Sequence, residues 1–158
     1  MKAYLPKTTV HSIDISEKAL NLAIENAKAN NADVEFLKLD ILNEKDWQKL
    51  GNSKFDIIIS NPPYVTQADK QNMQKNVLDH EPELALFVPE NDPLLFYKAI
   101  ADFSSMYLLP GGSIYLEINE SLGSETKAVY QDRDFINVEV LKDMMGKERM
   151  LEVRGFRL

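Results

Sequence analysis

The stretch "FDIIISNPPYV", residues 55–65, decides the fold, because an apolar run ends there at two consecutive prolines. The run from Ile57 to Ile59 is apolar without alternation, which is typical of a parallel strand in the middle of a sheet, covered on both faces. Pro62 and Pro63 have no backbone N–H group, so they cannot continue the hydrogen bonding of a sheet. We therefore predict a central parallel strand that stops abruptly in a stiff turn.

Strands and helices alternate on both sides of this stretch. The hydrophobic periodicity predicts helices over 16–31, 43–52, 92–109 and 121–132, and strands over 9–15, 33–41, 113–119, 136–143 and 149–158. Asp92 is the expected N-cap of the third helix, "PGG" at 110–112 is its expected end, and the last two strands suit an antiparallel hairpin. This pattern predicts an α/β three-layer sandwich with a mostly parallel sheet, in a single domain covering 1–158.

Composition narrows the classes of function. The chain has a formal net charge of -7, so binding of nucleic acid through phosphates is not expected. It has no cysteine and only two histidines, so we expect no metal site. The sequence shows neither a signal segment nor an apolar stretch long enough to span a membrane, which favours a soluble protein of the cytoplasm.

Polar side chains follow four of the predicted strands: Asp14, Asp40, Asn61, and Glu117 with Asn119. In open α/β sheets, ligands bind beyond the carboxyl ends of the strands, so these side chains are candidates for a site. Asp14 suits two ribose hydroxyls, although it or Ser16 could simply cap the next helix. Asp40 and Ile41 suit an adenine ring, although a solvated turn explains Asp40 nearly as well.

The tetrapeptide Asn61–Tyr64 offers a socket for a planar –NH2 group. The side-chain carbonyl of Asn61 and the backbone carbonyl of Pro62 can accept its two hydrogens, and the Tyr64 ring can stack on its plane. Such a nitrogen is a poor nucleophile, so its partner must be an activated electrophile, and a sulfonium methyl donor fits. The alternative is that the two prolines only make a rigid loop.

Several motifs together resemble one enzyme family. "HSIDIS" (11–16), "LDIL" (39–42), "NPPY" (61–64), "HEPELALF" (80–87) and "KDMMGKERMLEVRG" (142–155) follow one another as in the release factor glutamine methyltransferases, the HemK/PrmC family. The resemblance implies a Rossmann-like class I fold that uses S-adenosyl-L-methionine. It also implies, as substrate, the glutamine side-chain amide in the Gly-Gly-Gln motif of peptide chain release factors.

The resemblance assigns roles to individual residues. It implies that Asn61, Pro62 and Tyr64 are catalytic, that these residues and Pro63 bind the substrate, and that the cofactor contacts Asp14, Ile15, Asp40, Ile41 and Asn61. The family also has an N-terminal helical domain and a Gly-rich cofactor loop, and this sequence contains neither. We therefore expect a truncated fold without its first strand, weak cofactor binding by the chain alone, and exposed strand edges that could support self-association.

Two other functions remain open from the residues. Adenine methyltransferases of DNA and RNA share the Asn-Pro-Pro-Tyr motif and would use the same socket. A binding module without turnover would keep the fold and lose the chemistry. We also interpret residues 67–92, which include His80, as a helix or long loop that forms a lid over one end of the sheet.

Overall fold

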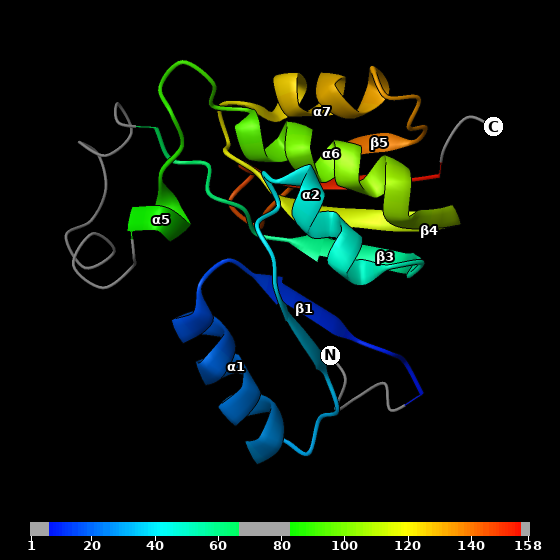
Figure 1. The fold of residues 1–158 in the computed structure, drawn as a ribbon. Helices are drawn as coiled ribbons and strands as arrows, with labels where there is room; N and C mark the ends of the chain where they lie inside the picture. Colours follow the sequence, from blue (N-terminus) through cyan, green and yellow to red (C-terminus); the bar gives the residue numbers. More distant parts are fainter. Residues whose placement is uncertain (1–6, 67–82, 156–158) are drawn as a thin grey trace. The chain divides into compact units, whose positions relative to one another are not determined.

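The computed structural model describes residues 7–66 and 83–155, and the chain divides into two compact units, Met1–Gly51 and Asn52–Leu158. The first unit contains the elements labelled β1 to α2 in Figure 1. Their bounds are β1 His11–Asp14, α1 Glu17–Ala29, β2 Glu35–Lys38 and α2 Glu44–Trp47, with a 3₁₀ turn at Gln48–Leu50. Strands β1 and β2 pair in parallel, so their carboxyl ends lie at the same edge of this small sheet.

Local sequence explains the first unit. The Ser16 hydroxyl accepts a hydrogen bond from the Ala19 N–H and caps α1, as one of the two interpretations of this segment predicted. The 3₁₀ turn ends at Gly51, whose φ of 57° is a conformation that glycine adopts at little cost. Trp47 is 3% exposed, so its ring is packed in the interior, and its indole N–H donates to the Ile41 carbonyl, which fixes the segment after β2.

The second unit is built on a four-stranded sheet. Its elements are β3 Phe55–Ser60, α5 Glu83–Leu86, α6 Leu95–Tyr107, β4 Leu108–Glu117, α7 Gly123–Gln131, β5 Val138–Lys142 and β6 Glu148–Arg154. The strand order is β3-β4-β6-β5, in which β3 and β4 are parallel and β6 is antiparallel to both of its neighbours. The predicted C-terminal hairpin is therefore confirmed.

The core of this unit lies between the sheet and the helices α6 and α7, which run together over one face of it in Figure 1. Side chains that alternate along the strands point into this layer and are at most 1% exposed: Ile114, Leu116, Leu151 and Val153. Aromatic rings complete it, with those of Phe103 and Tyr107 stacked 4.7 Å apart. The alternation along β4 and β6 thus produces one buried face and one open face.

Strand β3 differs from its prediction. Within the described residues it pairs only with β4, which makes it an edge strand of this sheet instead of a central one. Ile57 and Ile59 are 52% and 61% exposed, so the strand is not covered on both faces. The residues suit a central strand, but a strand becomes central only when a second neighbour occupies its other edge. The exposed edge agrees with the expectation of a fold without its first strand.

Helix α6 also departs from its prediction. It begins at Leu95 instead of directly after Asp92, and the Asp92 carboxylate binds the Lys98 ammonium group at 2.7 Å and does not cap the helix. It ends at Tyr107, and β4 starts at Leu108, so "PGG" lies inside the strand and does not end the helix. Gly112 fits there because a Cβ atom would come within 2.9 Å of the Asp56 carbonyl oxygen in β3.

The proposed lid lies mostly outside the described residues, and His80 lies wholly outside them. The part that is described begins with α5, and the Leu86 carbonyl accepts a hydrogen bond from the Val65 N–H at 2.9 Å.

Among residues 7–66 and 83–155, none of the helices has the length and hydropathy required to cross a membrane.

Candidate functional site

The Asn61–Tyr64 turn follows β3 directly and therefore lies at the carboxyl edge of the parallel pair β3–β4. Ser60, the last residue of β3, pairs with Leu116, so the turn comes level with the end of β4 at Glu117. Pro62 is buried, whereas Asn61 is exposed. The turn is thus anchored by one proline and presents the asparagine to solvent.

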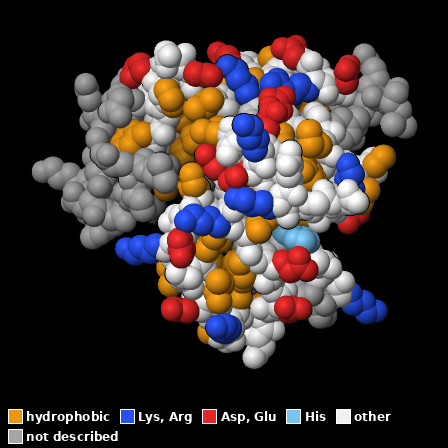
Figure 2. Space-filling model, viewed as in Figure 1, with side chains coloured by type: hydrophobic (Ala, Val, Ile, Leu, Met, Phe, Trp, Pro, Cys, Tyr) orange, Lys and Arg blue, Asp and Glu red, His pale blue; other side chains and the backbone are white. Residues whose placement is uncertain are grey.

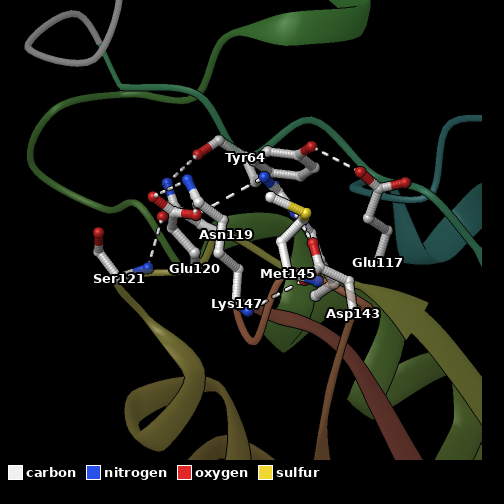
Figure 3. A network of polar contacts seen from close by, with 9 residues as sticks. Tyr64, Glu117, Asn119, Glu120, Ser121, Asp143, Met145 and Lys147 are labelled. Carbon is white, nitrogen blue, oxygen red and sulfur yellow. Dashed lines mark hydrogen bonds and ion pairs between the residues drawn. The ribbon is translucent and has the colours of Figure 1, made fainter.

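Tyr64 is held at two points by residues at the end of β4. Its phenol oxygen donates to the Oε1 atom of Glu117 over 2.7 Å, and its backbone carbonyl accepts from the Nδ2 atom of Asn119 over 3.1 Å. Figure 3 shows the ring between these two side chains. The direction of the ring and the position of the turn are therefore both fixed by β4.

A buried tyrosine of α6 supports this arrangement. The Tyr97 side chain is 0% exposed, and its hydroxyl oxygen accepts a hydrogen bond from the Asn119 N–H at 3.1 Å. The Oδ1 atom of Asn119 accepts from the Ser121 N–H at 2.9 Å. Burial raises the pKa of Tyr97, so its hydroxyl stays neutral and keeps its place in the network.

The hairpin between β5 and β6 joins the same network. The Lys147 ammonium group lies 2.9 Å from the Glu120 carboxylate, next in sequence to Asn119. The Asp143 carboxylate accepts hydrogen bonds from the Met145 and Lys147 N–H groups, which lower its pKa and fix the tip of the hairpin. The end of β4 is therefore connected to the turn of β3 on one side and to the hairpin on the other.

Asn61 itself is available for a ligand. Its side chain is exposed and makes no hydrogen bond with any other residue that the structure describes. An amide with unused donors and acceptors, on a turn that is fixed by its neighbours, is suited to bind a polar group from solution.

The candidates from the first unit lie at the carboxyl edge of β1 and β2. Asp14 is the last residue of β1, and one of its carboxylate oxygens accepts from the Ser16 N–H at 2.7 Å. Asp40 follows β2, and one of its oxygens accepts from the Leu42 N–H at 2.9 Å. Ile15, which is 44% exposed, and Ile41 come directly after these two residues. A carboxylate has several acceptor positions, so these local bonds leave room for ligand hydroxyls or an amine.

The sequence-predicted residues thus form two sets, one in each unit. Asp14, Ile15, Asp40 and Ile41 belong to the first unit, and the Asn61–Tyr64 turn belongs to the second. Among the residues described, no group of three or more histidine, aspartate or glutamate side chains is arranged to bind a metal ion.

Sequence reasoning missed two parts of the network. The sequence predicted a helix over 92–109 but gave no role to Tyr97, which is among the most buried side chains of α6. The link between the hairpin and Glu120 was not predicted either, although the "GKER" motif contains Lys147. The pattern of apolar and polar residues along the chain could not reveal the contacts of Tyr97 with Asn119 and of Lys147 with Glu120, because these residues are distant in sequence.

The environment of Tyr64 predicts an unusual ionisation. Burial, followed by the hydrogen bond and the charge of Glu117, raises the pKa of Tyr64 to about 12, and Arg149 opposes this change. The pKa in the unfolded chain is about 10, so Tyr64 contributes stability below about pH 10, and this contribution is lost as the pH rises towards 12. We expect the phenolate absorbance difference between the wild-type protein and Tyr64→Phe to show this high midpoint. A midpoint near pH 10 would contradict the observed contact.

A family model decides the class of this protein. The model called "Methyltransferase small domain" matches residues 1–84, which is more than half of the chain. The chain belongs to the methyltransferase small domain family. The matched residues include β1, β2, β3 and the Asn61–Tyr64 turn of this methyltransferase domain.

Curated relatives of this methyltransferase domain are more specific. The release factor glutamine methyltransferase of Flavobacterium psychrophilum is 44% identical over 94% of the chain, and that of Bacteroides thetaiotaomicron is 44% identical over 93%. A bifunctional methyltransferase of Rickettsia bellii is 31% identical over 98% of the chain. The chain spans about half of the first two relatives, 51% and 52% of their lengths. The predicted resemblance to the glutamine methyltransferases is confirmed.

Solved structures of methyltransferases share the fold. A methyltransferase from Pyrococcus furiosus matches 92% of the chain and 62% of its own length, with a TM-score of 0.63 and 18% identity. A release-factor-specific protein-(glutamine-N5) methyltransferase from Alicyclobacillus acidocaldarius matches 95% of the chain and 81% of its own length, with a TM-score of 0.53 and 20% identity. The predicted fold class, a truncated Rossmann-like α/β methyltransferase fold, is therefore confirmed.

Proposed function

We propose that this chain carries the acceptor half of an S-adenosyl-L-methionine-dependent methyltransferase that acts on release factors. The acceptor is the glutamine side-chain amide of the Gly-Gly-Gln motif. The observation that carries this proposal is the Asn61–Tyr64 turn, which is fixed at the carboxyl edge of β3 by Glu117 and Asn119. The relatives at 44% identity, named release factor glutamine methyltransferases, support it.

The turn acts on the acceptor amide in three ways. The Asn61 side-chain carbonyl and the Pro62 backbone carbonyl accept its two N–H hydrogens, and the Tyr64 ring covers its plane. As the new N–C bond forms, the nitrogen gains positive charge, so both acceptors bind it more strongly than in the ground state. The bond between the methyl group and the donor sulfur would break as the N–C bond forms, with its electron pair left on the sulfur. The nitrogen then releases one proton to water, so the product is the N-methylated amide. A strong base is not needed at this site.

The cofactor is assigned to residues of the first unit. The two carboxylates at the carboxyl ends of adjacent parallel strands suit its hydroxyl and amine groups, with Asp14 and Ile15 at the ribose and Asp40 and Ile41 at the adenine. The resemblance assigns Asn61 to the cofactor as well. When bound, it would supply a methyl group activated by a positively charged sulfur. We propose that both units belong to one partial methyltransferase domain.

Cofactor binding by the chain alone is expected to be weak or absent. The 158 residues contain no Gly-rich run that would let the backbone approach the cofactor closely, although Asp14 and Asp40 are present. Isothermal titration calorimetry with S-adenosyl-L-methionine measures this directly, with Asp14→Ala as the matched variant. A micromolar dissociation constant that is weakened in Asp14→Ala would refute the prediction.

The acceptor is tested by transfer of a labelled methyl group. Two proteins are assayed, the chain itself and the chain joined to the part of the Flavobacterium psychrophilum relative that it does not match. Each is offered a release factor, the same factor with Gln→Ala in its Gly-Gly-Gln motif, and double-stranded DNA. We expect label only in the unaltered release factor. Label in DNA would instead support the adenine methyltransferase function, and no label in any acceptor would support a binding module.

The surface charge agrees with a protein substrate. On the face drawn in Figure 2, Lys and Arg side chains are interspersed with Asp and Glu and do not gather into one basic stripe. The formal charge of -7 is of the wrong sign for a protein that binds mainly phosphates. Release factors are therefore a better match to this chain than DNA is.

A further inference from the structure

We infer that Glu117 and Asn119 are positioning residues that together clamp Tyr64 in the direction needed to cover the acceptor amide. This inference rests on the proposed function and adds two residues to its site. Glu117 ends β4 and Asn119 lies two residues further on, so in an extended chain both side chains emerge on the same side. The same side faces Tyr64, as the two hydrogen bonds drawn in Figure 3 show.

The Glu117 contact sets where the ring points. The phenol oxygen lies on the long axis of the ring, so a hydrogen bond to it fixes the direction of that axis, although the ring can still turn about the axis. The bond is short, 2.7 Å between Tyr64 Oη and Glu117 Oε1, as expected for a hydroxyl that donates to a carboxylate. Arg149 also interacts with this hydroxyl, but Glu117 is the residue that accepts its hydrogen.

The Asn119 contact sets where the turn lies. Its Nδ2 atom donates to the Tyr64 carbonyl, while its Oδ1 atom accepts from the Ser121 N–H, so the amide can have only this orientation. The Asn119 backbone is held in turn by the hydroxyl of the buried Tyr97. A chain of hydrogen bonds therefore connects the buried Tyr97 of α6 to Asn119 and then to the Tyr64 turn. Residues of a binding site need rigid support of this kind to keep their positions.

The clamp is expected to affect turnover more than binding. The ring needs to lie over the amide while its nitrogen becomes pyramidal in the transition state. Small errors in the position of the ring at that stage lower the rate of methyl transfer. Binding of the release factor depends on a much larger surface. Removing either anchor should therefore lower kcat and leave KM for the release factor nearly unchanged.

A double-mutant cycle tests whether Glu117 acts through Tyr64. In the joined protein described above, Tyr64→Phe and Glu117→Ala are each expected to lower kcat about tenfold, and the double variant should fall no further. Glu117→Gln keeps an acceptor oxygen and should retain most of the activity. The control is Glu139→Ala, an exposed glutamate of β5, which should leave kcat unchanged. Additive losses, or a failure of Glu117→Gln to retain activity, would overturn the inference.

A second measurement does not depend on activity. The 158-residue chain is labelled with 3-fluorotyrosine, and the ¹⁹F resonance of Tyr64 is identified by its loss in Tyr64→Phe. In Glu117→Ala this resonance should titrate at a lower pH than in the wild-type chain, because the acceptor and its charge are gone. The same midpoint in both proteins would show that the clamp is absent. If the Tyr64 midpoint shifts but no acceptor is methylated, the hydrogen bond between Tyr64 and Glu117 is present. The proposed function would then be wrong, and the positioning role that depends on it would be wrong as well.

Discussion

Replacing Asn61 by alanine is expected to lower kcat for methyl transfer about 10²–10³-fold, because one of two acceptors for the developing charge is lost. The side chain is exposed and makes no hydrogen bond within the described part of the chain, so the fold should not depend on it. The measurement is transfer of labelled methyl groups to a release factor by the joined protein. The free energy of unfolding is measured alongside and should stay within about 0.5 kcal/mol of the wild type.

The matched control is Asn52→Ala. Asn52 is an exposed asparagine before the start of β3, whereas Asn61 follows the end of the strand. The two substitutions remove the same amide from opposite ends of one strand, so only a role in the site distinguishes them. We expect Asn52→Ala to keep full activity. Equal activity of the two variants would rule out Asn61 as an acceptor for the reacting amide.

Replacing Ile114 by alanine is expected to lower the free energy of unfolding of the second unit by about 3 kcal/mol. Ile114 is 0% exposed and lies in β4 between its partners Ile58 of β3 and Val153 of β6. Its removal leaves a cavity in the layer between the sheet and the helices. Urea denaturation measures the change, with the slope of the transition as a check that the unfolded state is unaltered.

Ile59→Ala serves as the control for Ile114→Ala. It removes the same atoms from the neighbouring strand β3, where the side chain is 61% exposed, so the expected loss is within about 0.5 kcal/mol. Tyrosine absorbance should follow mainly the second unit, because five of the six tyrosines lie in it, whereas the single tryptophan, Trp47, lies in the first. A loss for Ile59→Ala as large as for Ile114→Ala would mean that the outer face of β3 is covered in solution.

Several elements could be predicted because their signals are local. Ser16 was expected to cap α1, and it does, since the N-cap depends on only the next three residues. The hairpin of β5 and β6 was expected from two apolar runs and a short polar connection, and it forms around Gly146 with φ 79°. Such features need little information from the rest of the chain.

Other elements were predicted wrongly because competing contacts decided them. Asp92 has the residue type and position of an N-cap, but the ammonium group of Lys98 binds its carboxylate and α6 starts at Leu95. The "PGG" run has the composition of a turn, yet Gly112 lies in β4 where it lets β3 approach closely. Propensity is a weak preference, and other contacts can outweigh it, whether their partners are near in sequence, as Asp92 and Lys98 are, or distant, as Gly112 and Asp56 are.

The sequence by itself determined the class of the fold and led to the proposed chemistry at the end of β3. An apolar strand that stops at Asn61, Pro62 and Pro63 defines both, because strand pattern and proline geometry are properties of the local chain. Only the tertiary structure decided how Tyr64 is held, through Glu117 and Asn119, which follow it by more than fifty positions. It also decided that β3 lies at an edge. Neighbours in a sheet depend on chain topology, which residue patterns do not encode.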